Sequence, residues 1–417
     1  MAEYIHLFET TSEFSGNYNG SAYAEPWVSY TLENTHVDYN KSEKEKLLGM
    51  PLTFEFMAGG NFAWSETLGS QNEVSYRFND GPWISAGSGF SLTVASGDTI
   101  QIKGTAVSAT YDTESPITCN CSNWKVKGNI MSVLYGDGYQ TADSFKHEVS
   151  FDIPITCGGF FSGCTGLIDA SQLKLPVTTL EMGGMKPGSY QNMFAGCTSL
   201  TAGPELPATV LSDLCYTSMF EGCTSLTTVP ELPATTLTGN CYSRMFLGCT
   251  SLSTAPELPA TAVTEYCYAE MFEGCTGLTA APELPATTMA NYCYGSMFSG
   301  CTSLTTAPEL PARDLAEACY HNMFAGCTSL TAAPELGAEI LDNFGYCYAG
   351  MFCGCTSLNY VKAMFITNPN EYGDYPYTFE WLKNVSATGT FVKNSIASWT
   401  TEYNENVIPT GWTVVNA

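Results

Sequence analysis

Cysteine recurs at a fixed spacing along this chain of 417 residues, and thiols can bind metals, form disulfides or attack substrates. Fourteen of the 18 cysteines fall into two sets, in which 26 residues is the usual spacing. The motif Gly-Cys-Thr holds Cys164, Cys197, Cys223, Cys249, Cys275, Cys301, Cys327 and Cys355, and the motif Cys-Tyr holds Cys215, Cys241, Cys267, Cys293, Cys319 and Cys347. On a helix, Cys215 and Cys223 would lie about 12 Å apart, too far for a disulfide. We therefore expect buried, reduced thiols that act as small apolar side chains.

Glutamate follows the same spacing. The members of this set are Glu205, Glu231, Glu257, Glu283, Glu309 and Glu335. Stacking of the repeats would place these carboxylates in one row, where divalent cations or cationic sugars could relieve their mutual repulsion. The alternative, which we favour, is a solvated stripe without a ligand.

Tyrosine forms a third row with this spacing, at Tyr216, Tyr242, Tyr268, Tyr294, Tyr320 and Tyr348. Exposed rings would make a platform for the apolar faces of sugars. Buried rings would belong to the core, and the neighbouring Met-Phe pairs favour that interpretation.

Residues for catalysis are scarce. The four histidines, His6, His36, His147 and His321, lie in different segments. The sequence contains no nucleophile elbow, P-loop or dinucleotide-binding fingerprint. We expect no enzymatic activity, no cofactor and no metal site.

The repeat that positions these rows reads C-Y-x-x-M-F-x-G-C-T-S-L-T-x-x-P-E-L-P-A-T-x-L. Apolar residues spaced four apart predict one face of a short helix, namely Leu211, Cys215, Met219 and Cys223. Gly222 suits a turn that ends this helix, and the two prolines that follow allow only a short extended segment, with Leu226 and Leu232 pointing inward. One such unit cannot bury its apolar face alone, so the pattern predicts stacked units with a shared core, which is a solenoid.

The motif M-F-x-G-C-T-S-L-T-x-x-P-E-L-P resembles the BspA-like leucine-rich repeats of gut Bacteroidales proteins and of phages that infect these bacteria. The resemblance covers about residues 157–362 and extends to flanking motifs near both ends of the chain. It implies a leucine-rich repeat solenoid of short strands and short helices. The repeats lack the asparagine of the standard leucine-rich pattern, so a regular horseshoe is not expected.

Four regions follow from these patterns. Residues 1–50 are interpreted as an extended N-terminal arm that could anchor the protein. Alternating apolar residues and an Asn79-Asp80-Gly81 turn predict an all-β, sandwich-like domain over residues 51–150. Residues 151–362 are predicted to form the solenoid of about eight 26-residue coils, and residues 363–417 its C-terminal cap.

The net charge and the first residues of the sequence restrict the classes of function that we expect. The net charge of −26 argues against nucleic acid as a partner, and no apolar run is long enough for membrane insertion. The first residues contain no secretory signal, so we expect a protein made in the host cytoplasm.

Three functions remain open. The preferred hypothesis is a phage virion component, a fibre or decoration protein. It would contact other virion proteins through its N-terminal region and a host surface or polysaccharide through its repeats, and it could form a homo-oligomer. The alternatives are a BspA-like adhesin on the bacterial cell surface and an accessory repeat module of a glycan-active enzyme.

Overall fold

The computed structural model describes residues 46–47, 49–65, 74–87, 89–104, 115–136, 157–175, 188–341, 345–369, 376–399, 402–404 and 406–417. The chain divides into two compact units, residues 1–42 and 43–417, and the first lies wholly outside the described residues. The predicted arm over residues 1–50 therefore lies outside them too, except for 46–47 and 49–50. The described residues form mainly β-strands and turns, with almost no helix.

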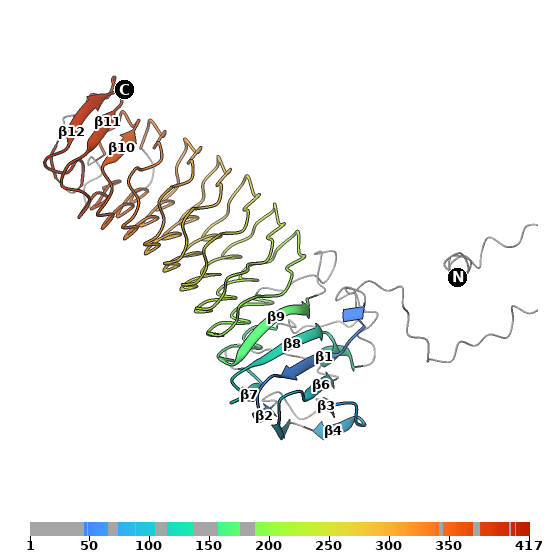
Figure 1. Cartoon of the computed structure of the whole chain (residues 1–417). Helices are drawn as coiled ribbons and strands as arrows, with labels where there is room; N and C mark the ends of the chain where they lie inside the picture. Colours follow the sequence, from blue (N-terminus) through green and yellow to red (C-terminus); the bar gives the residue numbers. More distant parts are fainter. Residues whose placement is uncertain are drawn as a thin grey trace, which may run out of the picture. The chain divides into compact units, whose positions relative to one another are not determined.

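Three sheets account for the strands (Figure 1). One sheet has six strands in the order β4-β3-β6-β1-β8-β9, a second has the order β5-β2-β7, and a third has the order β10-β11-β12. The elements are β1 (Leu52–Phe56), β2 (Gly60–Ser65), β3 (Val74–Phe78), β4 (Ile84–Gly87), β5 (Gly89–Val94), β6 (Thr99–Gly104), β7 (Ile117–Cys119), β8 (Trp124–Asn129), α2 (Ser132–Tyr135), β9 (Leu167–Lys174), β10 (Tyr360–Ala363), β11 (Thr390–Lys393) and β12 (Thr413–Asn416).

The first two sheets pack face to face through aromatic side chains. Alternate residues of β1 and β2 point inward, so that Phe54 and Phe62 meet with ring centroids 4.9 Å apart. Tyr76 and Phe90 stack at 4.2 Å farther along the same interface. The predicted hairpin at Asn79 is confirmed, since β3 and β4 pair antiparallel on either side of it. The alternation of apolar residues thus predicted this packed pair of sheets.

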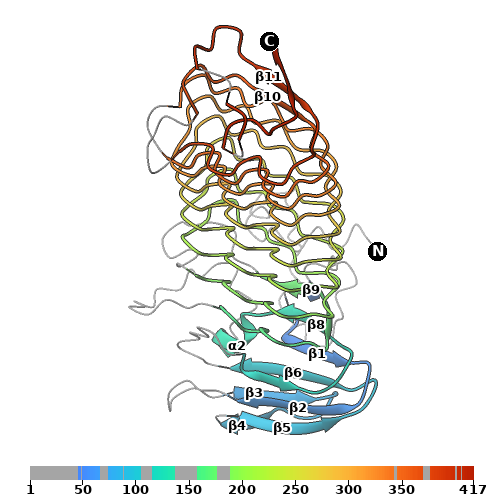
Figure 2. The same cartoon turned by 90° about the vertical axis from the view of Figure 1, so that its left-hand side faces the viewer.

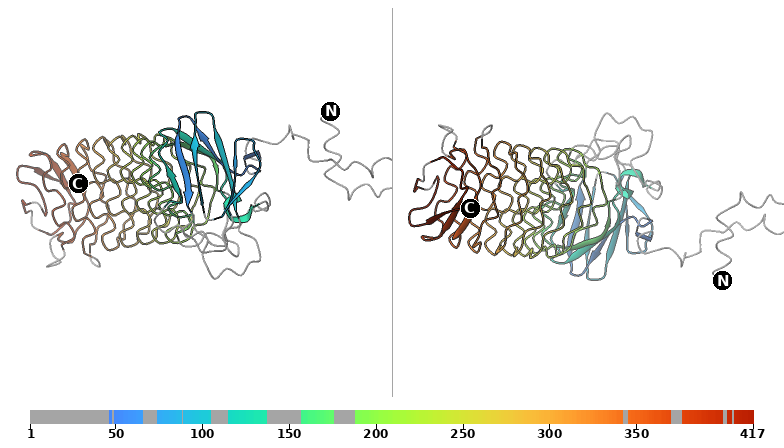
Figure 3. Two further views of the ribbon diagram at one scale, coloured as in Figure 1. Left: turned by 90° about the horizontal axis from the view of Figure 1, so that it is seen from below. Right: turned by 90° about the horizontal axis from the view of Figure 1, so that it is seen from above.

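Strand β9 joins the six-stranded sheet to the repeats. It pairs parallel with β8, and Asp169 of β9 forms a parallel bridge with Ala202 of the next unit. Ala202 bridges Thr228 in turn. Figure 3 shows the first two sheets at one end of the row of repeat units and β10 to β12 at the other. Strand β9 comes from the region predicted as solenoid, residues 151–362, yet it completes a sheet of the region predicted as a separate all-β domain, residues 51–150. The two predicted regions therefore share one sheet.

Each repeat unit contains a chain of tight turns, here called the turn ribbon, of which residues 212–223 are an example. Alternate backbone N–H groups bond within the unit, as when Met219 donates to the Tyr216 carbonyl at 3.2 Å. The N–H groups between them donate to the next unit, as Phe220 does to the Met245 carbonyl at 2.9 Å. Figure 2 shows successive units lying side by side in this way. Hydrogen bonding within and between units thus satisfies the polar backbone around a buried core.

The predicted helix in each unit is wrong. Positive φ recurs every fourth residue, with 61° at Leu214, 53° at Ser218 and 70° at Gly222. A positive φ at the third residue of a four-residue turn is what a type II turn requires, and it interrupts a right-handed helix. Two turns advance the chain by four residues, so the apolar face predicted for a helix is still buried on one side: Leu211, Cys215, Met219 and Cys223.

Prolines explain why the opposite side of the units makes single bridges rather than strands. Val210 bridges Thr236, and Ala280 bridges Thr306, without an extended ladder between them. Proline has no N–H to donate, and each of these units carries the sequence Pro-Glu-Leu-Pro. Where the prolines are missing, at β9 and β10, full strands form. The predicted inward leucines, Leu226 and Leu232, are buried.

Two columns of parallel rings fill the core of the units. Phenylalanines stack from Phe161 to Phe352 with centroids 5.2 to 5.7 Å apart. Tyrosines stack from Tyr190 to Tyr348 at 5.8 to 6.0 Å. Each stacked pair contributes about 0.5–1.5 kcal/mol beyond the burial of its area. The columns therefore hold each unit in register with the next.

The C-terminal segment ends both columns. Trp381 lies 6.4 Å from Tyr348 and 6.4 Å from Phe352, and its indole N–H donates to the Val407 carbonyl. Residues 376–383 continue the hydrogen-bonding pattern of the turn ribbon without its sequence motif, since Phe352 donates to the Trp381 carbonyl at 2.9 Å. The segment predicted as a cap thus adds one further unit that carries large buried indoles.

Candidate functional site

The six glutamates of the predicted row are all exposed, on the proline side of the units. A lysine lies at each end of this row. Lys174 Nζ is 3.3 Å from the Glu205 carboxylate, and Lys362 Nζ is 2.8 Å from that of Glu335. Among the described residues, no ion pair reaches the four glutamates between these ends. The row is a solvated acidic stripe bounded by two lysines.

The predicted tyrosine row, in contrast, lies inside the molecule. Tyr216, Tyr242 and the four that follow are each 1% exposed and stacked on one another. Burial raises the pKa of Tyr216 well above its ordinary value. These rings belong to the core, so they offer no exposed face to a sugar.

The repeat cysteines are also buried, and all 18 cysteines of the chain are free thiols. From Cys197 onward, the thiols of the Gly-Cys-Thr set donate to the carbonyl of a phenylalanine in the preceding unit, as Cys249 does to Phe220 at 3.2 Å. Burial raises the pKa of Cys223 and of Cys275 to about 12. At neutral pH these thiols are protonated, so they are poor nucleophiles and poor metal ligands.

The sequence differences between units collect on the turn ribbon. We call its outward side the turn face, and its first position is the residue before the Cys-Tyr motif. This position holds Gly188 in the first unit, then Leu214, Asn240, Tyr266, Tyr292, Ala318 and Tyr346. Interior positions hardly change from unit to unit, whereas this one changes in size and polarity. The turn face is therefore the part of the repeats that can recognise a particular ligand.

An aromatic cluster stands out on the turn face. Tyr266 and Tyr292 are half-buried, and their rings stack with centroids 4.9 Å apart and an angle of 8°. His321 meets Tyr292 edge-on at 6.4 Å. Burial lowers the pKa of His321, which leaves the imidazole uncharged at neutral pH. Burial raises the pKa of Tyr292, and the nearby Glu317 carboxylate adds to that rise.

Acidic side chains surround the arginine beside this cluster. Arg244 lies 3.3 Å from the Glu221 carboxylate and 3.6 Å from that of Glu270. Burial raises the pKa of Glu273, and Glu270 adds to this rise while Arg244 opposes it. The turn face therefore offers tyrosine rings within an acidic surface.

The sequence analysis considered only the tyrosines that follow cysteine, and its preferred interpretation of them as core residues agrees with their burial. It missed the half-buried tyrosines of the turn face, which precede cysteine at a position where other units hold asparagine or alanine. These tyrosines could have been identified from the sequence, because the residue at their position differs from unit to unit. Apolar positions that keep the same residue in every unit lie in the core.

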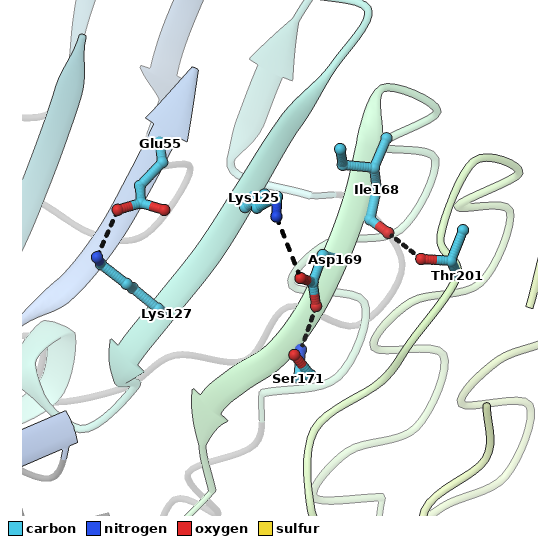
Figure 4. Close-up of polar contacts among 7 residues, drawn as sticks. All are labelled: Glu55, Lys125, Lys127, Ile168, Asp169, Ser171 and Thr201. Atoms are coloured by element: carbon cyan, nitrogen blue, oxygen red, sulfur yellow. Dashed lines mark hydrogen bonds and ion pairs between the residues drawn. The ribbon is translucent and has the colours of Figure 1, made fainter. Parts of the chain in front are cut away.

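A second cluster of polar side chains connects the six-stranded sheet to the first repeat units (Figure 4). Lys127 of β8 pairs with Glu55 of β1, and Lys125 lies 3.6 Å from Asp169 of β9. The Thr201 hydroxyl of the next unit donates to the Ile168 carbonyl at 2.8 Å. Every charge here has a partner on the adjacent strand, which is the arrangement of a structural contact.

Within the described ranges, no group of three or more His, Cys, Asp or Glu side chains is arranged to hold a metal ion. None of the described helices has the length and apolar character needed to cross a bilayer. Comparisons with protein-family models, curated proteins and solved structures find no match to this chain.

Proposed function

We propose that this chain is a non-enzymatic binding protein built on a solenoid of BspA-like leucine-rich repeats. The unit spacing of 26 residues, the leucines on the proline side and the resemblance of the motif support this assignment. The repeats differ from the short-helix form of the prediction, because turn ribbons replace the helices. The two sheets at one end and Trp381 at the other cover the ends of the shared core, which terminal units of a solenoid require.

The observation that carries this function is the contrast between interior and turn face. Stacked rings and buried thiols repeat with little change inside. Outside, the first position of the turn face ranges from glycine to tyrosine. A fold that fixes its interior and varies one column whose larger side chains are partly exposed is suited to present side chains to a ligand, as solenoids do.

We assign this binding role to a phage virion, in a fibre or decoration protein that attaches particles to a host surface or to polysaccharide. Many copies on one particle would turn weak contacts into strong attachment. The N-terminal region, residues 1–50, would hold the protein on the particle through other virion proteins. The acidic repeats would remain in solution, because like charges resist aggregation.

Mass spectrometry of density-purified particles tests this assignment. The chain is expected in particles from a culture that expresses it, and a variant without residues 1–50 is expected to be lost from them. Recovery of the full chain from the bacterial envelope alone would overturn the virion assignment in favour of an adhesin. Incorporation of the truncated chain would overturn the anchoring role of its N-terminal region.

A further inference from the structure

The half-buried tyrosines of the turn face occupy a backbone position that does not require tyrosine. Tyr266 and Tyr292 each have a φ of 53°. This left-handed conformation is unfavourable for a residue with a bulky side chain, and it suits glycine or asparagine better. Asparagine does hold this position at Asn240, with a φ of 54°. Bulky side chains in a strained conformation often mark functional positions.

The backbone itself is the same whichever side chain is present. The N–H of Asn240 donates to the Glu265 carbonyl at 3.1 Å, and that of Tyr292 donates to the Glu317 carbonyl at 3.0 Å. The N–H of Ala318 makes the equivalent bond to Gly345 at 3.3 Å. Asparagine, tyrosine and alanine thus support one geometry, so the tyrosines are not required by the stacking of the units.

The two rings form a short platform with one open end. Tyr292 is covered by Tyr266 on one face and approached by the edge of His321. The preceding unit places the short Asn240 beside Tyr266, and among the described rings none but Tyr292 stacks on Tyr266. The outer face of Tyr266 is therefore the side on which a flat, partly apolar ring can lie.

The negative charge of the turn face determines which sugar rings can bind there. The Glu317 carboxylate is close enough to Tyr292 to influence its phenol, and Glu265 is exposed in the unit of Tyr266. Glu270 and Glu273 add negative charge on the same turn face, where Arg244 is already paired. Tyrosine rings attract cations through their negative faces, and carboxylates strengthen this attraction. Uronic acids and sulfated sugars would be repelled.

We propose that Tyr266, Tyr292 and Glu265 form a binding site for a saccharide that carries free amino groups. The apolar face of a pyranose ring would lie on the tyrosines, and its ammonium group would face the carboxylates. This inference rests on the proposed attachment function and names the class of ligand. The site lies in the middle of the units, so each copy of the chain presents it once.

Isothermal titration calorimetry on the full chain tests the site, with oligomers of glucosamine and of N-acetylglucosamine of equal length as probes. The amino oligomer is expected to bind about tenfold more tightly than the acetylated one, and the double variant Tyr266→Ala/Tyr292→Ala is expected to lose about tenfold in affinity for it. The variant Glu265→Gln should bring the two oligomers to similar affinity. Tyr360→Ala and Glu283→Gln, exposed positions on the side of the units opposite the turn face, serve as matched controls.

Equal binding of the two oligomers by the unaltered chain, or no binding of either, would overturn the site. Equal effects of Glu283→Gln and Glu265→Gln on affinity would also overturn the site, because the attraction would then depend only on the total charge of the chain. If the tyrosine variant failed to fold by circular dichroism, the comparison of Glu265→Gln with the unaltered chain would decide alone. Incorporation into particles is measured separately, so failure of this site and failure of the proposed function give different results.

Discussion

Cysteine suits its place in the repeats because its thiol is both small and a hydrogen-bond donor. The Cys301 thiol donates to the Phe272 carbonyl at 3.1 Å, and the same contact recurs from unit to unit with donor–acceptor distances of 3.0 to 3.2 Å. The Phe272 carbonyl also accepts from the Cys275 backbone N–H, so the thiol supplies a second hydrogen bond, which alanine would remove. The repeated cysteines are therefore structural groups, which agrees with the expectation from their spacing.

Replacement of one such thiol tests this role. We expect Cys249→Ala to lower the free energy of unfolding by about 1–2 kcal/mol, because the thiol hydrogen bond to the Phe220 carbonyl is lost and a small cavity remains, while the Cys223 N–H still donates to that carbonyl. Cys353→Ala, at a partly exposed cysteine outside both sets, is the control and should change it by less than about 0.5 kcal/mol. Urea denaturation measures both. A neutral Cys249→Ala would show that the thiol contact contributes nothing.

The pKa shifts predict sensitivity to alkali. Burial raises the pKa of Cys241, Cys267 and Cys275 to about 12, whereas an unfolded cysteine has a pKa of about 8.5. The unfolded chain therefore releases protons first as pH rises, and stability falls between those two values. Each such thiol contributes about 1.4 kcal/mol per pH unit in this range. Circular dichroism from pH 8 to 12 should show steep unfolding. A flat signal to pH 12 would contradict the burial of these thiols.

At the scale of the element, the turn ribbon depends on positive φ at every fourth residue. Gly248 has a φ of 72° and lies against Gly222 of the preceding unit, whereas Gly239 of the same unit has no positive φ and ordinary spacing around it. We expect Gly248→Ala to cost about 1–2 kcal/mol of unfolding free energy and Gly239→Ala to be nearly neutral. Thermal denaturation compares them. Equal melting temperatures would contradict the turn geometry.

The C-terminal segment that covers the last repeat unit should determine how readily the units at that end unfold locally. Trp381 covers the ends of both ring columns, and we expect Trp381→Ala to cost about 3–5 kcal/mol. Hydrogen exchange should then accelerate first in the units nearest residue 355, where the columns are uncovered. The exposed Phe379→Ala in the same segment is the control. Uniform acceleration along all the units would contradict a capping role.

The sequence predicted some of these elements and missed others for physical reasons. Alternation in β1 and β8 predicted two strands of the first sheet, since an apolar side chain at every second residue is typical of a strand with one buried face. The spacing of Leu211, Cys215 and Met219 suggested a helix, but a strict period of four drifts by about 40° at each step on a helix of 3.6 residues per turn. Paired turns give this period without drift, yet positive φ at Ser218 or Tyr266 leaves no clear mark in sequence.

For the molecule as a whole, the spacing of the repeats predicted that equivalent side chains would align. The composition around each row favoured a solvated glutamate stripe and a buried tyrosine row, and the exposure of the side chains agrees with both interpretations. The glutamates proved exposed and the regular tyrosines buried. The cluster of Tyr266, Tyr292 and His321 joins residues from three units, so the contacts within it appear only once the units are stacked.

The central claim is that the turn face of the repeats makes the contact with a host surface. Flow cytometry of Bacteroidales cells incubated with the labelled full chain tests it directly. We predict that Tyr266→Ala/Tyr292→Ala/His321→Ala reduces bound label about tenfold, whereas Glu231→Gln/Glu257→Gln/Glu283→Gln on the proline side leaves it unchanged. Loss of binding in the glutamate variant with full binding in the aromatic variant would contradict the account.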